Sequence, residues 1–246
     1  MAETARVGMT LPTAIGNGQD IPVRCGRYGE IVTKPLAGGK YPYAEEGSYF
    51  VATSVIDTPI TASIASAYSA TASTFIFLRN ASSATASQPV RIYLDYIKLL
   101  VKTIPGSAAE WGYACHIDNG ASTFTSTGTN ITPVNPNGDI SATSVVGTTM
   151  YVGACVTTAR TNGRLVARGR WVPFIPVTYD VYILKFGSSE ESGGGVKTSA
   201  TAAGVIHACA PPVIIPPSWN FTMSMYGTSN SGTAMTAEFE MGWWER

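Results

Sequence analysis

The side chains best suited to metal binding are two histidines and four cysteines. His116 follows Cys115 directly, and His207 lies two residues before Cys209. Thiolate and imidazole are ligands that zinc prefers, so these two pairs could supply a four-ligand site. In strands, however, residues 207 and 209 share a face, whereas residues 115 and 116 point to opposite faces. Because the short spacings typical of zinc sites are also missing, the sequence predicts no metal site.

The sequence gives only weak indications of a catalytic set of side chains. Asp118 lies close to His116, but Ser and Thr are so abundant that a nearby hydroxyl carries little information about a triad. The Gly-x-Ser-x-Gly elbow of many hydrolases is missing from the sequence. A glycosidase needs two facing carboxylates, whereas Glu238 and Glu240 occupy the polar positions of an alternating strand pattern. The other acidic residues fall mostly in predicted loops: Asp57, Asp118, Asp139, Glu190 and Glu191. We therefore predict no catalytic residues and a non-enzymatic protein.

The indications of a cofactor site or a sugar site in the sequence are equally weak. The glycine run at 193–195 lacks the lysine and the following helix of a phosphate-binding loop, so we predict no cofactor. Trp219, Trp243 and Trp244 could form a sugar-stacking platform, although alternating aromatic residues are more typical of a core. Trp244 departs from the alternation, and with Arg246 it is a candidate for an intersubunit contact.

The cysteines and the start of the chain bear on the cellular compartment. Cys25, Cys115, Cys155 and Cys209 lie far apart, which indicates buried thiols in a reducing cytosol. The polar opening lacks the apolar core of an export signal, so we expect synthesis in a cytoplasm. The glycosylation patterns at Asn80, Asn130 and Asn220 therefore carry no weight.

The elements that would position these side chains are predicted to be β-strands. Runs rich in aromatic and β-branched residues are bounded by clusters of Gly, Pro, Asn and Ser. Residues 89–102 could form a helix, but their β-branched and Tyr content favours a strand. The ten predicted strands are 48–53, 73–78, 89–102, 111–117, 143–156, 164–175, 179–186, 204–209, 218–226 and 234–244.

Turn signals and strand number together predict the fold. Asn162-Gly-Arg, between two apolar runs, is the strongest hairpin signal, and Asp118-Asn-Gly marks another turn. About ten strands without a convincing amphipathic helix predict an all-β, antiparallel β-sandwich, most simply a jelly roll. Residues 1–46 contain apolar anchors but no sustained period, which predicts an extended N-terminal arm. The sandwich domain is then 47–246.

Composition points to association with other protein. Charged residues make up only 13% of the 246 residues, against an average near 25%, while 45% are hydrophobic. So little surface charge suits a protein whose surface faces other protein, and we predict a homotrimer. The 16 basic and 16 acidic residues give no net charge, which argues against binding to nucleic acid or to a membrane.

The whole chain resembles structural proteins of tailed bacteriophages. The resemblance rests on residues 8–24, on the 45–53 junction, on the proline-bounded 210–217 segment and on the closing Trp-Trp-Glu-Arg. The chain is similar to capsid cement or decoration proteins, which are β-sandwich modules, commonly jelly rolls, placed as dimers or trimers over junctions between major capsid subunits. The resemblance implies a virion protein on the capsid surface with the major capsid protein as partner. The alternatives are a tail or fibre module that binds a receptor, and a carbohydrate-binding or carbohydrate-active sandwich.

Overall fold

The structure is a computed structural model that describes residues 44, 47–62, 68, 74–104, 110–120, 123–158, 163–171, 176–187, 203–228 and 234–246. These residues belong to the compact unit Tyr43–Arg246. The named elements of the described residues are all strands, so the predicted all-β class is confirmed. The predicted arm, 1–46, lies outside the described residues except for Ala44.

Each of the ten predicted strands corresponds to an observed strand. They are β1 (Tyr49–Thr53), β3 (Thr74–Arg79), β4 (Ile92–Thr103), β5 (Glu110–Asp118), β8 (Met150–Thr157), β9 (Arg164–Trp171), β10 (Val181–Phe186), β11 (Val205–Ala210), β13 (Asn220–Thr228) and β14 (Met235–Glu245). Four further strands were not predicted, because two or three residues are too few to show a period. They are β2 (Ile60–Ala62), β6 (Phe124–Ser126), β7 (Thr129–Asn130) and β12 (Ile214–Ile215).

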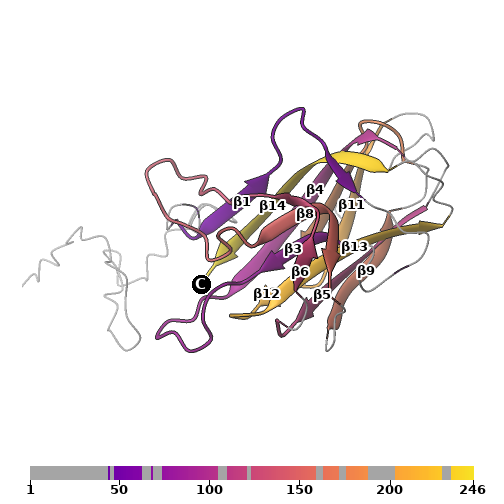
Figure 1. Ribbon diagram of the computed structural model, residues 1–246. Coiled ribbons are helices and arrows are strands. Elements are labelled where there is room, and N and C mark those ends of the chain that lie inside the picture. Colours follow the sequence, from indigo (N-terminus) through magenta and orange to yellow (C-terminus); the bar gives the residue numbers. More distant parts are fainter. Residues whose placement is uncertain are drawn as a thin grey trace, which may run out of the picture. The chain divides into compact units, whose positions relative to one another are not determined.

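The strands form two sheets (Figure 1). The first sheet has the order β1-β14-β4-β10-β11, with β12 paired to β4 and β2 paired to β14. The second has the order β6-β8-β3-β13-β5-β9, with β7 paired to β8. Eight of the strands alternate between the sheets in chain order, except at the step from β5 to β9: β1, β4, β10 and β14 lie in the first, and β3, β5, β9 and β13 lie in the second.

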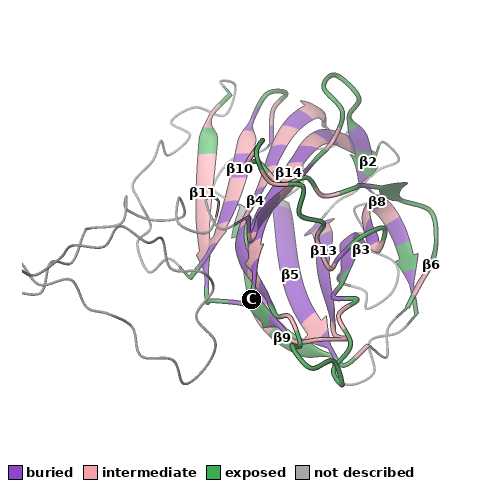
Figure 2. Cartoon of the chain, turned by 90° about the vertical axis from the view of Figure 1, so that its left-hand side faces the viewer, coloured by how far each residue is buried: buried purple, intermediate pink, exposed green. Residues whose placement is uncertain are grey.

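The two sheets pack face to face as a β-sandwich, with one hydrophobic core between them. Phe75 of β3 meets Phe239 of β14 edge to face, with ring centroids 6.4 Å apart, and Phe186 of β10 meets Phe221 of β13 at 6.2 Å. Figure 2 shows buried positions alternating with more exposed ones along β10 and β14 of the first sheet, whereas β5 of the second sheet is buried along most of its length. Strand β14 follows the predicted alternation, since its inward residues are buried: Met235, Ala237, Phe239, Met241 and Trp243.

Three predictions about connections need correction. The Asn162-Gly hairpin is wrong, because β8 pairs with β3 while β9 pairs with β5 on the far side of the second sheet. The sandwich is not wholly antiparallel, because β10 and β11 run parallel. The long 187–204 connection permits that pairing, since parallel neighbours need a crossover of about a dozen residues or more. The strand predicted at 143–156 begins only at Met150.

Among the described residues, no helix is long and apolar enough to cross a membrane.

Candidate functional site

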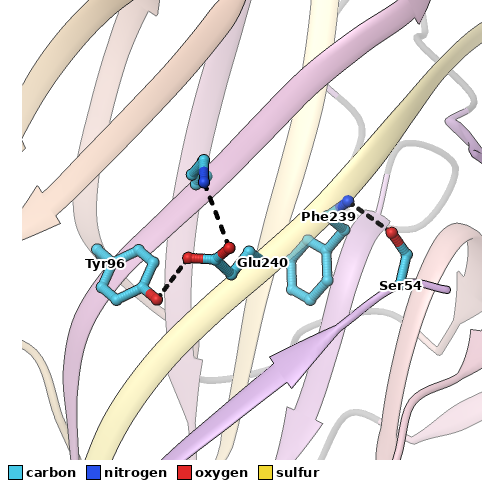
Figure 3. Close-up of polar contacts among 5 residues, drawn as sticks. Ser54, Tyr96, Phe239 and Glu240 are labelled. Atoms are coloured by element: carbon cyan, nitrogen blue, oxygen red, sulfur yellow. Dashed lines mark hydrogen bonds and ion pairs between the residues drawn. The ribbon is translucent and has the colours of Figure 1, made fainter. Parts of the chain in front are cut away.

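The main cluster of ionisable side chains spans β1, β14 and β4 of the first sheet. It consists of Tyr49 from β1, Glu240 from β14, and Asp95, Tyr96 and Lys98 from β4. Tyr96 Oη donates a hydrogen bond to Glu240 Oε1 at 2.6 Å, and Lys98 Nζ lies 3.3 Å from Glu240 Oε2 (Figure 3). Tyr49 Oη donates to Asp95 Oδ2 at 2.6 Å. Glu240 is thus bound by side chains of the adjacent strand β4, whereas Asp95 of β4 is bound by Tyr49 of β1, on the far side of β14.

A glycine makes room for the two tyrosines of the strand cluster. A Cβ on Gly242 would lie 2.5 Å from Tyr96 Cε1 and would also meet the Tyr49 hydroxyl. Gly242 is the direct cross-strand neighbour of Tyr96. The same arrangement occurs twice in the second sheet, where a tyrosine covers the glycine opposite it: Tyr226 over Gly112 and Tyr113 over Gly169. Such aromatic cover restores the packing that a glycine in a strand otherwise lacks.

The strand cluster holds its hydroxyl groups in the protonated form. Burial raises the pKa of Tyr49, and the hydrogen bond to Asp95 raises it further. Burial and the hydrogen bond to Glu240 raise the pKa of Tyr96 in the same way. A phenol that keeps its proton is a donor and not a base or a nucleophile. The arrangement is therefore suited to tying strands together.

A second ionic group lies next to the strand cluster. Lys102 Nζ lies 2.9 Å from Glu238 Oε1 and 3.3 Å from Asp57 Oδ1. The hydrogen bond to Glu238 is the main cause of the raised pKa of Lys102. Glu238 and Glu240 thus take the polar positions of β14 as predicted, but each is held by a lysine of β4 and is only partly exposed. The carboxylates serve cross-strand ion pairs on this face.

The Cys/His pairs lie in different sheets. Cys115 is packed in the core, and burial raises the pKa of its thiol. His116 Nε2 lies 3.2 Å from Tyr68 Oη, and the two rings stack with centroids 5.6 Å apart. His207 and Cys209 lie on β11 of the other sheet. The described residues contain no group of three or more His, Cys, Asp or Glu that could hold a metal ion.

The described cysteines are thiols, as predicted: Cys115 and Cys155 are buried, whereas Cys209 is only partly buried, against the prediction. Cys25 lies outside the described residues. Burial raises the pKa of Cys155 to about 12, so this thiol keeps its proton at neutral pH and is a poor nucleophile.

The prediction that Asp118 lies in a loop is wrong. This residue ends β5, is fully buried, and accepts hydrogen bonds from Gly120 N at 2.9 Å and from Asn220 Nδ2 at 3.1 Å. These bonds hold the Asp118-Asn-Gly turn, where Gly120 has a φ of +83°.

The asparagines of the three glycosylation patterns are bound within the fold. Asn220 donates to Asp118, Asn80 is fully buried, and the amide of Asn130 donates to Thr148 O and Met150 O. All three asparagines of the glycosylation patterns therefore have structural roles.

Sequence reasoning missed a buried carboxylate at the end of β14. Glu245 Oε1 accepts hydrogen bonds from Ser144 Oγ at 2.5 Å and Trp243 Nε1 at 3.0 Å, while Val145 N donates to Oε2 at 3.0 Å. Burial raises the pKa of Glu245, and the three donors oppose that rise. Trp244 stacks almost parallel on Tyr93 of β4, with centroids 5.8 Å apart. Two of its three donors, Ser144 and Val145, lie about 100 residues away, so the sequence near Glu245 does not show why it is tolerated.

Two cavities have linings that contain none of the strand-cluster residues. One, of about 310 Å³, is lined by residues 132–135, 140–144 and 147. The other, of about 210 Å³, is lined by residues 53–55, 58–60 and 129–132. Neither lining contains a charged residue. Both linings combine aliphatic side chains with Ser, Thr and Asn, so these hollows offer apolar and uncharged polar contacts.

The geometry therefore offers two features for function: a network of tied strands and an uncharged, hollowed surface. Comparisons of the chain with protein-family models, with curated proteins and with solved structures gave no match.

Proposed function

We propose that the chain is a non-enzymatic structural protein of a tailed-bacteriophage virion, a cement or decoration protein that binds the outside of the capsid. In this proposal the sandwich is a jelly roll and residues 1–46 are an extended arm. The protein associates with itself and with the major capsid protein, and it stabilises contacts between capsid subunits through buried interface without chemistry.

Strand order is the observation that carries the proposal. A jelly roll has eight strands in two sheets and is typical of viral capsid and lectin domains. In the proposal the eight strands are β1-β14-β4-β10 of one sheet and β3-β13-β5-β9 of the other, each set contiguous in the observed strand order. Strands β5 and β9 are adjacent in one sheet, and the other steps between successive members of the eight change sheets. The remaining strands extend this set at its edges or pair beside it.

The chemistry of the described side chains agrees with a structural role. The phenols of the strand cluster and the thiols of Cys115 and Cys155 are held protonated, and the carboxylates of Asp95 and Glu240 are bound by side chains of other strands in the same sheet. Such groups resist shear between strands more readily than they attack a substrate. A protein that must bear load in a shell benefits from strands cross-linked by side chains as well as by the backbone ladder.

Binding to capsids by the full chain and by a chain that starts at residue 47 tests the proposal. We expect the full chain to sediment with capsids assembled from the phage major capsid protein. The shortened chain should keep its β-type circular dichroism and a cooperative melt but lose binding, because the arm contributes interface and not core. A full chain that stays in the supernatant would contradict the cement role. A shortened chain that aggregates or melts without cooperativity would contradict the arm.

A carbohydrate-binding sandwich is the second candidate. Tyr93 and Trp244 stack on β4 and β14, and further along the same two strands Tyr96 lies beside Lys98 and Glu240. Aromatic and polar groups on one sheet suit a sugar. Titration with soluble oligosaccharides, followed by tryptophan fluorescence, distinguishes the candidates. A saturable change that Trp244→Ala abolishes would favour the sugar, and an unchanged spectrum would favour the virion role.

A further inference from the structure

One end of the sandwich carries a projecting apolar loop beside the two cavities. We call residues 53–59 and 129–149 the loop surface. Ile56 is 85% exposed, Val55 is 72% exposed and Val134 is 56% exposed. Residues 53–55, 58–60 and 129–132 line the smaller cavity together, so the two segments are continuous in space. Exposed aliphatic residues gathered in this way are typical of a contact with another protein.

The loop surface is held rigid. Ser54 N donates to Phe239 O at 2.8 Å and Phe239 N donates to Ser54 Oγ at 3.0 Å, which fixes the start of the loop (Figure 3). Asp57, with a φ of +56°, is paired with Lys102 just after Ile56. On the other side, Val51 and Val134 exchange two backbone hydrogen bonds of 2.9 and 2.8 Å. A pre-ordered surface loses little conformational entropy when it binds.

The charge pattern limits the possible partner. Residues 119–159 contain one charged residue, Asp139, although the chain as a whole is 13% charged. The loop surface contains Asp57 and Asp139 and no lysine or arginine. Nucleic acid and anionic lipid require basic residues, so they do not fit it. Depletion of charge is instead typical of the centre of a protein–protein interface.

We propose that copies of this chain associate through the loop surface, with Val55 and Ile56 of one copy seated against the cavities of another. The loop surface has 26 residues that are at least partly exposed, and a stable interface uses roughly 20 to 30 residues from each side. Two such surfaces can meet with almost no repulsion, because each is nearly uncharged. Each copy carries both the projecting loop and the hollows, so the loop of one copy can fit the hollows of an identical copy. This inference rests on the self-association in the proposed function and identifies its surface.

Light scattering at micromolar concentration tests the inference with Ile56→Asp. We expect the native chain to form an oligomer and the variant to approach the mass of one chain, 25.9 kDa, because the new carboxylate would be buried without a partner. The dissociation constant should rise about a hundredfold or more, as for a central interface residue. Val134→Asp, across the cavities, should act in the same way. Leu165→Asp on β9 is the matched control, since Leu165 is 49% exposed and lies outside the loop surface.

The outcomes separate this inference from the proposed function. If the native chain is an oligomer and both loop-surface variants keep its mass, the loop surface is not the contact, while self-association stands. If Leu165→Asp dissociates the oligomer and Ile56→Asp does not, the contact lies on the second sheet. A native chain that is monomeric at all concentrations overturns self-association and this inference together. Circular dichroism melts verify that each variant is folded.

Discussion

Asn80→Asp should lower the free energy of unfolding by about 3 to 5 kcal/mol, because it places a carboxylate where two carbonyls now receive hydrogen bonds. Asn80 is fully buried, and its Nδ2 donates to Val90 O at 2.9 Å and to Ile215 O at 3.0 Å. Its Oδ1 accepts from Ser82 N at 3.0 Å. The substitution removes both donors, keeps the volume and adds charge. Thermal unfolding followed by circular dichroism should show a melting temperature about 10 °C lower or more.

Asn119→Asp is the matched control, because Asn119 is exposed in the Asp118-Asn-Gly turn and the same chemical change there adds only a solvated charge. Its melting temperature should stay within about 2 °C of the native value. Equal melting temperatures for the two variants would show that the Asn80 amide does not hold the 82–90 and 215 segments to the end of β3.

Gly153→Ala should cost about 3 to 5 kcal/mol, since it combines backbone strain with a steric clash. Gly153 lies in β8 with a φ of +115°, and a Cβ there would lie 2.8 Å from Ile60 Cγ2 and 2.9 Å from Thr61 O. Thr61 belongs to β2 of the first sheet, so this glycine allows close approach of a strand from each sheet. The carbonyl cannot move aside as a flexible side chain could. Denaturant unfolding measures the loss.

Substitutions of two other glycines distinguish the effect of backbone strain from the effect of the steric clash. Gly147 has a φ of +53° and no atom within 4 Å of the position that a Cβ would take, so Gly147→Ala should cost only the strain, about 1 to 2 kcal/mol. Gly138 has neither feature, and Gly138→Ala should be neutral or slightly stabilising. If Gly153→Ala were no worse than Gly147→Ala, the close approach of β2 and β8 would not be as described.

The strands could be predicted from sequence because their pattern is local. In β14 every second residue is large and apolar from Met235 to Trp243, apart from Ala237, and burial follows that pattern. The order of strands is not local, and this is why the Asn162-Gly hairpin failed. A turn signal states that the chain bends, but β9 pairs with β5, whose residues precede it by about fifty positions. Core packing and not the turn decides which strands become neighbours.

The contacts of the candidate site could be predicted from the sequence less well than the strands. The alternation placed Glu238 and Glu240 outward, yet their partners, Lys102 and Lys98, come from a strand more than 130 residues earlier. The register between β4 and β14 decides which lysine meets which carboxylate. Buried Asn80 had no local signal at all, because an asparagine before a Ser-rich loop is typical of an exposed turn. Only the tertiary structure shows the carbonyls that it binds.

The temperature at which DNA leaves the capsid measures whether the chain stabilises the shell. DNA-filled heads that lack this protein would be heated with a dye that fluoresces on released DNA, before and after the purified chain is added. We expect that added chain raises the release temperature and that the rise saturates at a fixed number of copies per head. A chain given Ile56→Asp should need a higher concentration for the same rise. A release temperature that stays the same while the chain is bound would contradict the cement function.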